Sequence, residues 1–210
     1  MDHTVKNRFD NASKAYVTEK YFWRYQSACL VSKLVCPEVS DIILDIGCGT
    51  GKQIIELSGS VKLCIGIDIS DGMVGQAVEN ALNENRDNVK FYTGTFDEPE
   101  RNINLMEMQL TKIISNYALH HLNLKEKQHA ITKMVDIGGQ SLQTIVIGDL
   151  MFFENPLRYK DEFNAVGYGP GSDTPSTVEE LIECFANFPF KVEMHKLHPL
   201  AGVLVANRRP

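Results

Sequence analysis

Short apolar runs alternate with amphipathic stretches along most of the chain. The run over residues 41–46 is rich in β-branched side chains and ends at a glycine cluster, which is typical of a buried strand. Later runs share this character, and stretches with helical spacing of apolar positions separate them. The pattern predicts strands over 41–46, 61–67, 89–92, 112–115 and 144–148, and helices over 52–57, 75–83 and 125–135.

Strands that alternate with helices indicate parallel β-α-β units with right-handed crossovers. The alternation ends after Asp149: residues 151–176 are irregular and rich in aromatics, 178–186 form a helix, and 190–206 form two closing strands. Before the first strand, residues 12–35 read as one or two helices. We therefore expect an α/β fold, Rossmann-like and doubly wound, with a mostly parallel seven-stranded sheet and an antiparallel closing hairpin.

Composition narrows the class of protein. A chain of 210 residues is long enough for one domain with a substantial core. The net charge of −6 argues against broad nucleic-acid binding, which needs clustered cations. Five cysteines without a C-x-x-C pair favour reduced thiols, and no apolar run is long enough for a membrane span. We expect a soluble cytoplasmic protein, monomer or homodimer, without a metal.

The richest local signal is the segment Leu44-Asp-Ile-Gly-Cys-Gly-Thr-Gly-Lys52, in which a strand runs into three glycines spaced G-x-G-x-G. Glycine permits a tight turn and lets a ligand lie against the backbone. The helix that follows offers free N–H groups, at the sheet edge where α/β proteins bind ligands. Asp68 ends the next strand, where its carboxylate can accept hydrogen bonds from both hydroxyls of a ribose.

Two other nucleotide loops fail on spacing. A dinucleotide fingerprint starting at Gly47 requires glycine at position 52, which is Lys52. A phosphate-binding P-loop requires glycine at 46 and Ser or Thr at 53, where Ile46 and Gln53 stand. The alternative that remains open is a tight strand-to-helix turn with a capping acid on the next strand.

Four segments together resemble a known family. LDIGCGTGK and GIDIS resemble the first two signature motifs of class I S-adenosylmethionine-dependent methyltransferases, and segments 91–96 and 114–122 are similar to the loops after that family's third and fourth strands. Segment 8–16 is similar to the F-D-x-x-A-x-x-Y start of small-molecule members, including quinone-biosynthesis and malonyl-carrier methyltransferases. The resemblance spans roughly residues 8–150. It implies N-terminal lid helices over 1–37, a cofactor-binding core over 38–150, and a substrate-side loop with closing strands over 151–210.

The resemblance also implies S-adenosylmethionine as cofactor and a small-molecule acceptor. Asp45, with the backbone of the glycine loop, would hold the methionine end, Asp68 the ribose, and side chains after the second and third strands the adenine. Many relatives have Asp or Glu at the position of Thr95, where it would accept a hydrogen bond from the adenine amine; Asp97 is the alternative residue for that role here. The implied cofactor-binding residues are Tyr16, Asp45, Gly47, Cys48, Gly49, Gly51, Asp68, Ile69, Met73, Thr95, Phe96 and Asn116.

The implied chemistry is an in-line displacement at the methyl of a sulfonium, to which positioning contributes up to ~7–11 kcal/mol. Tyr117, His120 and His121 follow the fourth strand and are the candidate catalytic residues, because a histidine there can accept a proton or orient the acceptor. The alternative is that the histidines cap or pack the next helix. The pair His195 and His198 looks structural, because an odd separation on a strand places side chains on opposite faces.

Three alternatives stay open from the sequence. The aromatic segment 151–171 would either line a substrate pocket or form a satellite cluster that packs the N-terminal helices onto the sheet. The methyl acceptor could instead be RNA or protein. A domain that binds the cofactor and regulates without catalysis would keep the same motifs, because binding residues and catalytic geometry are separate.

Overall fold

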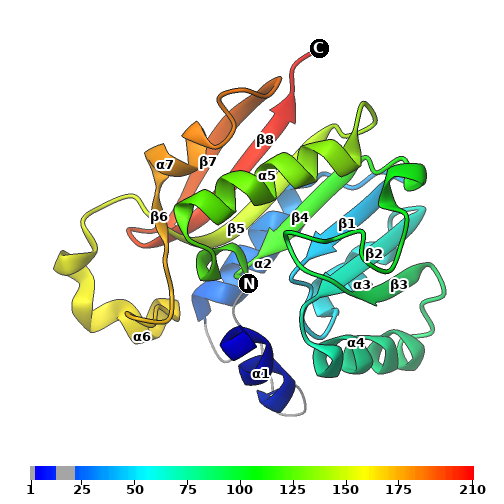
Figure 1. Cartoon of the computed structure of the whole chain (residues 1–210), viewed down its shortest axis with the longest axis horizontal. Helices are drawn as coiled ribbons and strands as arrows, with labels where there is room; N and C mark the ends of the chain where they lie inside the picture. Colours follow the sequence, from blue (N-terminus) through cyan, green and yellow to red (C-terminus); the bar gives the residue numbers. More distant parts are fainter. Residues whose placement is uncertain (1–2, 13–21) are drawn as a thin grey trace.

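The protein is described by a computed structural model over residues 3–12 and 22–210. Its sheet has the strand order β3-β2-β1-β4-β5-β8-β7 (Figure 1). The first five strands are parallel, and β8 and β7 pair antiparallel at the far edge. The strands are β1 (Ile42–Ile46), β2 (Leu63–Asp68), β3 (Val89–Thr93), β4 (Lys112–Asn116), β5 (Thr144–Phe152), β7 (Phe190–His198) and β8 (Ala201–Arg208).

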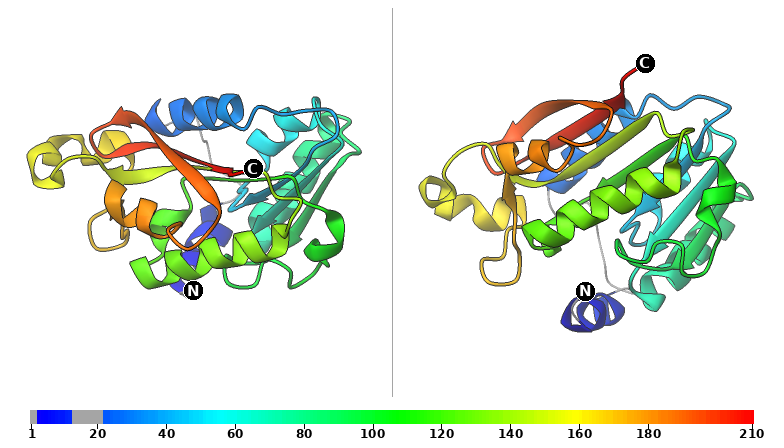
Figure 2. Two further views of the ribbon diagram at one scale, coloured as in Figure 1. Left: turned by 90° about the horizontal axis from the view of Figure 1, so that it is seen from above. Right: turned by 45° about the horizontal axis from the view of Figure 1, so that its top comes forward.

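Helices cover both faces of the sheet, as Figure 2 shows for α2 on one side and α5 on the other. Both faces are apolar because consecutive side chains of a strand point to opposite faces of the sheet. In β1, Ile43 packs in the apolar cluster with α2 and α3, whereas Leu44 packs in the cluster with α5. The helices are α1 (His3–Ala12), α2 (Phe22–Leu34), α3 (Lys52–Ser58), α4 (Asp71–Asn83), α5 (Leu124–Gly138), α6 (Phe163–Val166) and α7 (Val178–Glu183).

The predicted α/β fold with five parallel strands and a closing hairpin is confirmed, and two of the element ends that differ have a clear cause. Helix α4 begins at Asp71 and not at position 75, because the Ser70 hydroxyl accepts a hydrogen bond from Met73 N at 3.1 Å and caps the helix. Strand β5 continues to Phe152, because it pairs there with the two-residue strand β6 (Ser176–Thr177), an eighth strand that the sequence pattern did not predict.

The aromatic segment after β5 packs against α2. Its side chains Phe152, Tyr159, Phe163 and Tyr168 surround a small buried cluster together with Trp23 of α2. This arrangement matches the satellite-cluster alternative, because it joins an N-terminal helix to the end of the sheet. His198 belongs to the same region: its Nε2 lies 2.6 Å from a Glu162 carboxylate oxygen, which agrees with a structural role.

None of the helices in the described part of the chain is long and apolar enough to cross a membrane.

Candidate functional site

A cavity of about 350 Å³ opens at the carboxyl ends of the parallel strands. The loop after β1, the end of β2 and the end of β4 form its floor, and side chains of α1, α2 and α3 complete the walls. This volume lies within the range of small-molecule and cofactor pockets.

The three loop glycines all have positive φ, and they have different spatial roles. A Cβ on Gly47 would lie 2.4 Å from the Ala118 Cβ, and one on Gly51 would lie 2.7 Å from the Phe91 ring. A Cβ on Gly49, at φ +55°, would meet no atom within 4 Å. Gly47 and Gly51 are therefore required by packing, whereas Gly49 leaves open space in the cavity wall.

Asp68 ties this loop to the end of β2. Its two carboxylate oxygens accept hydrogen bonds from Gly49 N and Ser70 N, both at 2.9 Å. Burial raises the pKa of Asp68, although these backbone hydrogen bonds favour the charged form. Each oxygen has a second lone pair for a ligand, and the side chain lines the cavity.

Asp45 is the second carboxylate of the cavity. It is only 3% exposed, and its Oδ1 has no hydrogen-bond partner among the residues that the structure describes. Burial, together with the charge of Asp68, raises the pKa of Asp45 to about 8. A buried acceptor of this kind is costly unless a ligand supplies a donor or a cation.

The structure brings most of the predicted cofactor-binding residues to one cavity. Gly51 does not line it, because it packs beneath the loop, and Asp97 lies outside, paired with His129 at 2.8 Å. Tyr16 falls outside the described residues. The predicted residues that line the cavity are Asp45, Gly47, Cys48, Gly49, Asp68, Ile69, Met73, Thr95, Phe96 and Asn116.

Sequence reasoning missed the helical wall. Residues of α2 and α3 line one side of the cavity, and the two helices are joined where Gln53 Nε2 donates to Ala28 O and Ser32 Oγ, both at 3.2 Å. Apolar and polar residues of α2 show little helical periodicity, so the sequence carries no sign of which residues face a ligand. The missed lining residues on these helices are Arg24, Tyr25, Ala28, Cys29, Ser32, Lys52, Gln53 and Glu56.

The candidate catalytic residues differ in their access to the cavity. Tyr117 and His121 line it, whereas His120 is 1% exposed and does not. Tyr117 has φ +54°, a rare conformation for a non-glycine residue, and its buried hydroxyl has no partner within the described ranges. Burial raises the pKa of Tyr117 well above its usual range, so its phenol stays protonated.

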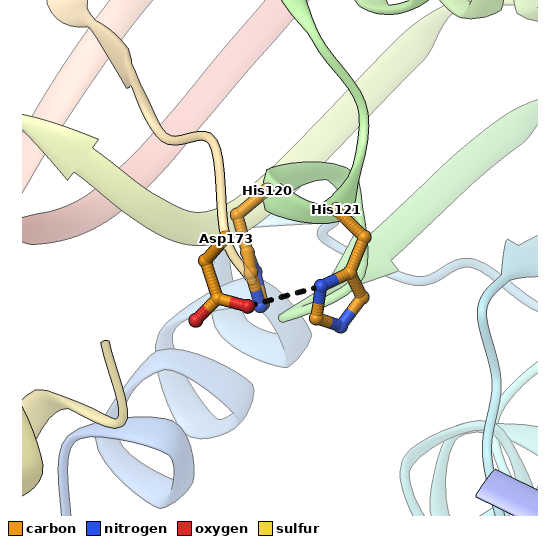
Figure 3. A group of neighbouring side chains, drawn as sticks. All are labelled: His120, His121 and Asp173. Carbon is orange, nitrogen blue, oxygen red and sulfur yellow. Dashed lines mark ion pairs between the residues drawn. The ribbon is translucent and has the colours of Figure 1, made fainter. Parts of the chain in front are cut away.

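The two histidines have carboxylate partners from different elements, Asp149 from strand β5 and Asp173 from the loop before β6. His120 Nδ1 lies 2.5 Å from Asp149 Oδ1. His121 Nδ1 lies 3.3 Å from Asp173 Oδ1, the pair that the dashed line marks in Figure 3. Arg8 of α1 donates to His121 Nε2 at 3.1 Å. Burial lowers the pKa of His121, so the ring is neutral at pH 7.

Helix α1 is fastened beside the cavity through the start of α4. Asp10 accepts hydrogen bonds from Ser70 Oγ at 2.5 Å and Gly72 N at 3.3 Å, and Lys6 pairs with Asp71 at 2.8 Å. These contacts position Phe9, which lines the cavity and lies 5.7 Å from the His121 ring.

Comparison with known proteins gives consistent matches. Residues 43–138 match the model of a methyltransferase domain. An uncharacterized methyltransferase of Bacillus pumilus is 25% identical over 199 residues, which cover 91% of this chain and 87% of that protein.

Two solved structures share the fold. Magnesium protoporphyrin IX methyltransferase from Synechocystis, with S-adenosylhomocysteine bound, has a TM-score of 0.65 at 19% identity, covering 89% of this chain and 83% of that one. The small RNA methyltransferase HEN1 has a TM-score of 0.69 at 14% identity, covering 93% of this chain and 26% of that one. The glycine loop, the strand order and the matched domain agree: residues 43–138 form a methyltransferase domain of the class I S-adenosylmethionine-dependent type.

Proposed function

We propose that the cavity binds S-adenosylmethionine and that the enzyme transfers its methyl group to a small molecule. The observation that carries this proposal is the buried, unpartnered Oδ1 of Asp45 in a cavity that Gly49 leaves open. The ammonium group of the methionine moiety supplies the cation and the donors that this oxygen lacks. This argument concerns only the charge of the cofactor's ammonium group, so it does not depend on which molecule accepts the methyl group.

The remaining cofactor contacts follow from the lining. Asp68 accepts hydrogen bonds from the ribose hydroxyls through its free lone pairs, while its backbone partners keep the carboxylate in place. Ile69 and Met73 pack on one side of the adenine, and Thr95 and Phe96 border its edge. Asn116 is oriented by a hydrogen bond from Ser27 Oγ at 2.7 Å, so that its side chain has a fixed direction beside the sulfonium.

Methyl transfer needs the acceptor, the methyl carbon and the sulfur in line, and this chain contributes mainly by positioning them. The protonated hydroxyl of Tyr117 has no partner within the described ranges, so it is available to donate a hydrogen bond to the methyl acceptor. His121, neutral and on the cavity wall, is the residue we place next to the acceptor. His120 is a positioning residue, because Asp149 binds both its ring and its backbone N–H, at 2.5 and 2.8 Å, and so fixes the turn that carries His121.

The proposal of a small acceptor rests on enclosure and charge. Phe9 of α1 and Tyr25 of α2 flank the cavity, and a net charge of −6 disfavours an RNA backbone. An RNA or protein methyltransferase is the alternative, since the fold is shared by HEN1. A regulatory domain without turnover is the other. We place the enzyme in the cytoplasm, as a monomer or homodimer.

Calorimetry of the full chain with S-adenosylmethionine, S-adenosylhomocysteine and NAD tests the cofactor. We expect micromolar or tighter binding of the first two, about −8 kcal/mol, and far weaker binding of NAD. Equal or tighter NAD binding would overturn the assignment. Transfer of labelled methyl to metabolite fractions, with tRNA and protein fractions in parallel, then identifies the acceptor class. Label confined to RNA or protein contradicts the small-molecule proposal, and cofactor binding without transfer to any fraction favours the regulatory alternative.

A further inference from the structure

Two histidines and an aspartate converge beside the cavity (Figure 3). His120 and His121 lie on the 3-10 turn after β4, and Asp173 lies on the loop before β6. One ligand atom from each residue lies within 4.8 Å of the others, and all three side chains are at most 6% exposed. Such an enclosed group of N and O donors is the kind of set that holds a metal ion.

The backbone fixes this convergence. Thr174 N donates to His120 O at 2.8 Å, which joins the loop of Asp173 to the turn of the histidines. Asp173 Oδ2 accepts a hydrogen bond from Gly169 N at 2.7 Å, which orients the carboxylate. The cluster is therefore held by main-chain contacts from two elements that are about 50 residues apart in sequence.

His120 offers an available lone pair. Asp149 can only accept a hydrogen bond, so in the neutral imidazole of His120 the proton lies on Nδ1 and Nε2 carries the lone pair. That Nε2 is buried and has no partner in the described part of the chain. A carboxylate on the outer nitrogen of a histidine is the usual arrangement behind a metal ligand, where it fixes the tautomer and raises ligand basicity.

His121 and Asp173 are placed as a second nitrogen and an oxygen ligand. Their 3.3 Å separation equals the edge expected, about 3.3 Å, when both ligands lie about 2.0–2.1 Å from a tetrahedral ion. A metal ion binds the neutral imidazole and the carboxylate form of such ligands.

We propose that His120 Nε2, His121 Nδ1 and Asp173 bind a divalent transition-metal ion of the zinc type. Two imidazoles and one carboxylate suit Zn²⁺, Co²⁺ or Fe²⁺ and are unsuited to Mg²⁺, which prefers oxygen ligands. Three protein ligands leave coordination positions open, as at catalytic zinc sites. This departs from the expectation, drawn from the sequence, that no metal is bound, since neither the spacing nor the cysteines pointed to Asp173.

Arg8 would compete with a metal ion for His121. Its guanidinium donates to His121 Nε2, which holds the neutral ring in the tautomer with a proton on Nδ1. The ion must replace that proton, and the contact with Arg8 must be lost as Nε2 takes up a proton or turns away. Metal binding is therefore coupled to helix α1. Because His121 also lines the cavity, an ion here would hold an oxygen of the methyl acceptor, a consequence that rests on the proposed function.

Titration of the metal-free full chain with Co²⁺ tests the site, because tetrahedral cobalt with nitrogen ligands absorbs in the visible. We expect one ion per chain, displacement by Zn²⁺ and not by Mg²⁺. His120→Ala and Asp173→Asn should weaken binding at least about 100-fold. Asp149→Asn, which keeps the shape but alters the partner of His120, should weaken it about 10- to 100-fold. Arg8→Ala should tighten it.

The matched control is His129→Ala. His129 forms an exposed pair with Asp97 at 2.8 Å, so its loss should leave Co²⁺ binding unchanged. The inference is overturned if no visible cobalt bands form, because the space between the two histidines would then hold at most a water molecule. It is also overturned if His129→Ala weakens Co²⁺ binding as much as His120→Ala does. Melting curves identify any unfolded variant, and the isosteric Asp173→Asn is then decisive. Calorimetry with S-adenosylhomocysteine on the same metal-free protein keeps the failure of this site separate from a failure of cofactor binding.

Discussion

At the level of single residues, burial of the two cavity carboxyl groups, Asp68 and Asp45, costs different amounts of folding free energy. Asp68 is stabilised by two backbone N–H groups, whereas Asp45 has an oxygen without a partner in the residues described. An unpaired buried carboxylate destabilises the folded state, and such strain is retained where it serves a ligand. Asp45 is therefore the residue at which ligand binding and stability should oppose each other.

We predict that Asp45→Asn weakens cofactor binding and stabilises the free protein. Loss of a charge-assisted hydrogen bond, worth about 1.5–3 kcal/mol, should weaken binding tenfold or more. The pKa of Asp45 is about 8 in the fold against its usual 3.8, so between these pH values the folded state keeps a proton that the unfolded chain has released. Stability of the wild-type protein should therefore fall as pH rises from about 4 to about 8.

Urea unfolding at pH 5 and pH 8 measures that loss, which Asp45→Asn should remove. Asp136→Asn, an exposed carboxylate on α5, is the control and should change neither binding nor the pH dependence. An Asp45→Asn protein that binds the cofactor as tightly as the wild type would show that the ammonium group lies elsewhere.

Gly49 allows a second test at this scale. Gly49→Val should abolish cofactor binding, because a Cβ there enters the open cavity and a β-branched residue strains at φ +55°. Gly75→Val is the matched control: the Gly75 Cβ position is also free of neighbours, but it lies on the exposed face of α4. Calorimetry should separate the two variants by at least about 100-fold. Equal affinities would place the ligand away from the glycine loop.

At the level of secondary-structure elements, α1 lies at the edge of the fold and is held to the start of α4 by several polar contacts. The Asp10 carboxylate lies at the N-terminus of α4, where the helix dipole and the free N–H of Gly72 favour negative charge. The same helix carries Arg8 and Phe9, which both contact His121. We infer that α1 closes the cavity over the cofactor and transmits changes at His121 to α4.

Asp10→Ala should release α1 and weaken S-adenosylhomocysteine binding by about three- to tenfold, because one or two hydrogen bonds that hold the closed helix are lost. In the wild-type protein, hydrogen exchange should show α1 amides slowing on ligand binding while β1 and β4 change little. Asn7→Ala, at an exposed position of the same helix, should behave as the wild type. If α1 exchanges at the same rate with and without ligand, it is not a lid.

At the scale of the whole molecule, the order of elements and the sheet edge that carries the cavity were predictable. Most of the parallel strands read as short apolar runs, and right-handed crossovers leave few topologies. The glycine spacing and Asp68 are equally local, because a strand, a turn and the next strand are enough to define them. The extension of β5 and the pairing of β6 were not predictable, because they depend on a partner 25 residues further along the chain.

The fold class and the family resemblance were predictable from the amino-acid sequence alone, because both depend on short-range patterns: apolar periodicity, three glycines and one acid. The tertiary structure decided which histidine reaches the cavity, and it joined His120 to Asp149 and His121 to Asp173. It also turned one side of α2 toward the ligand space. Those contacts join segments that are 25 or more residues apart, and no local propensity specifies them. They arise only when burial of the two apolar clusters fixes how the helices and loops cross the sheet.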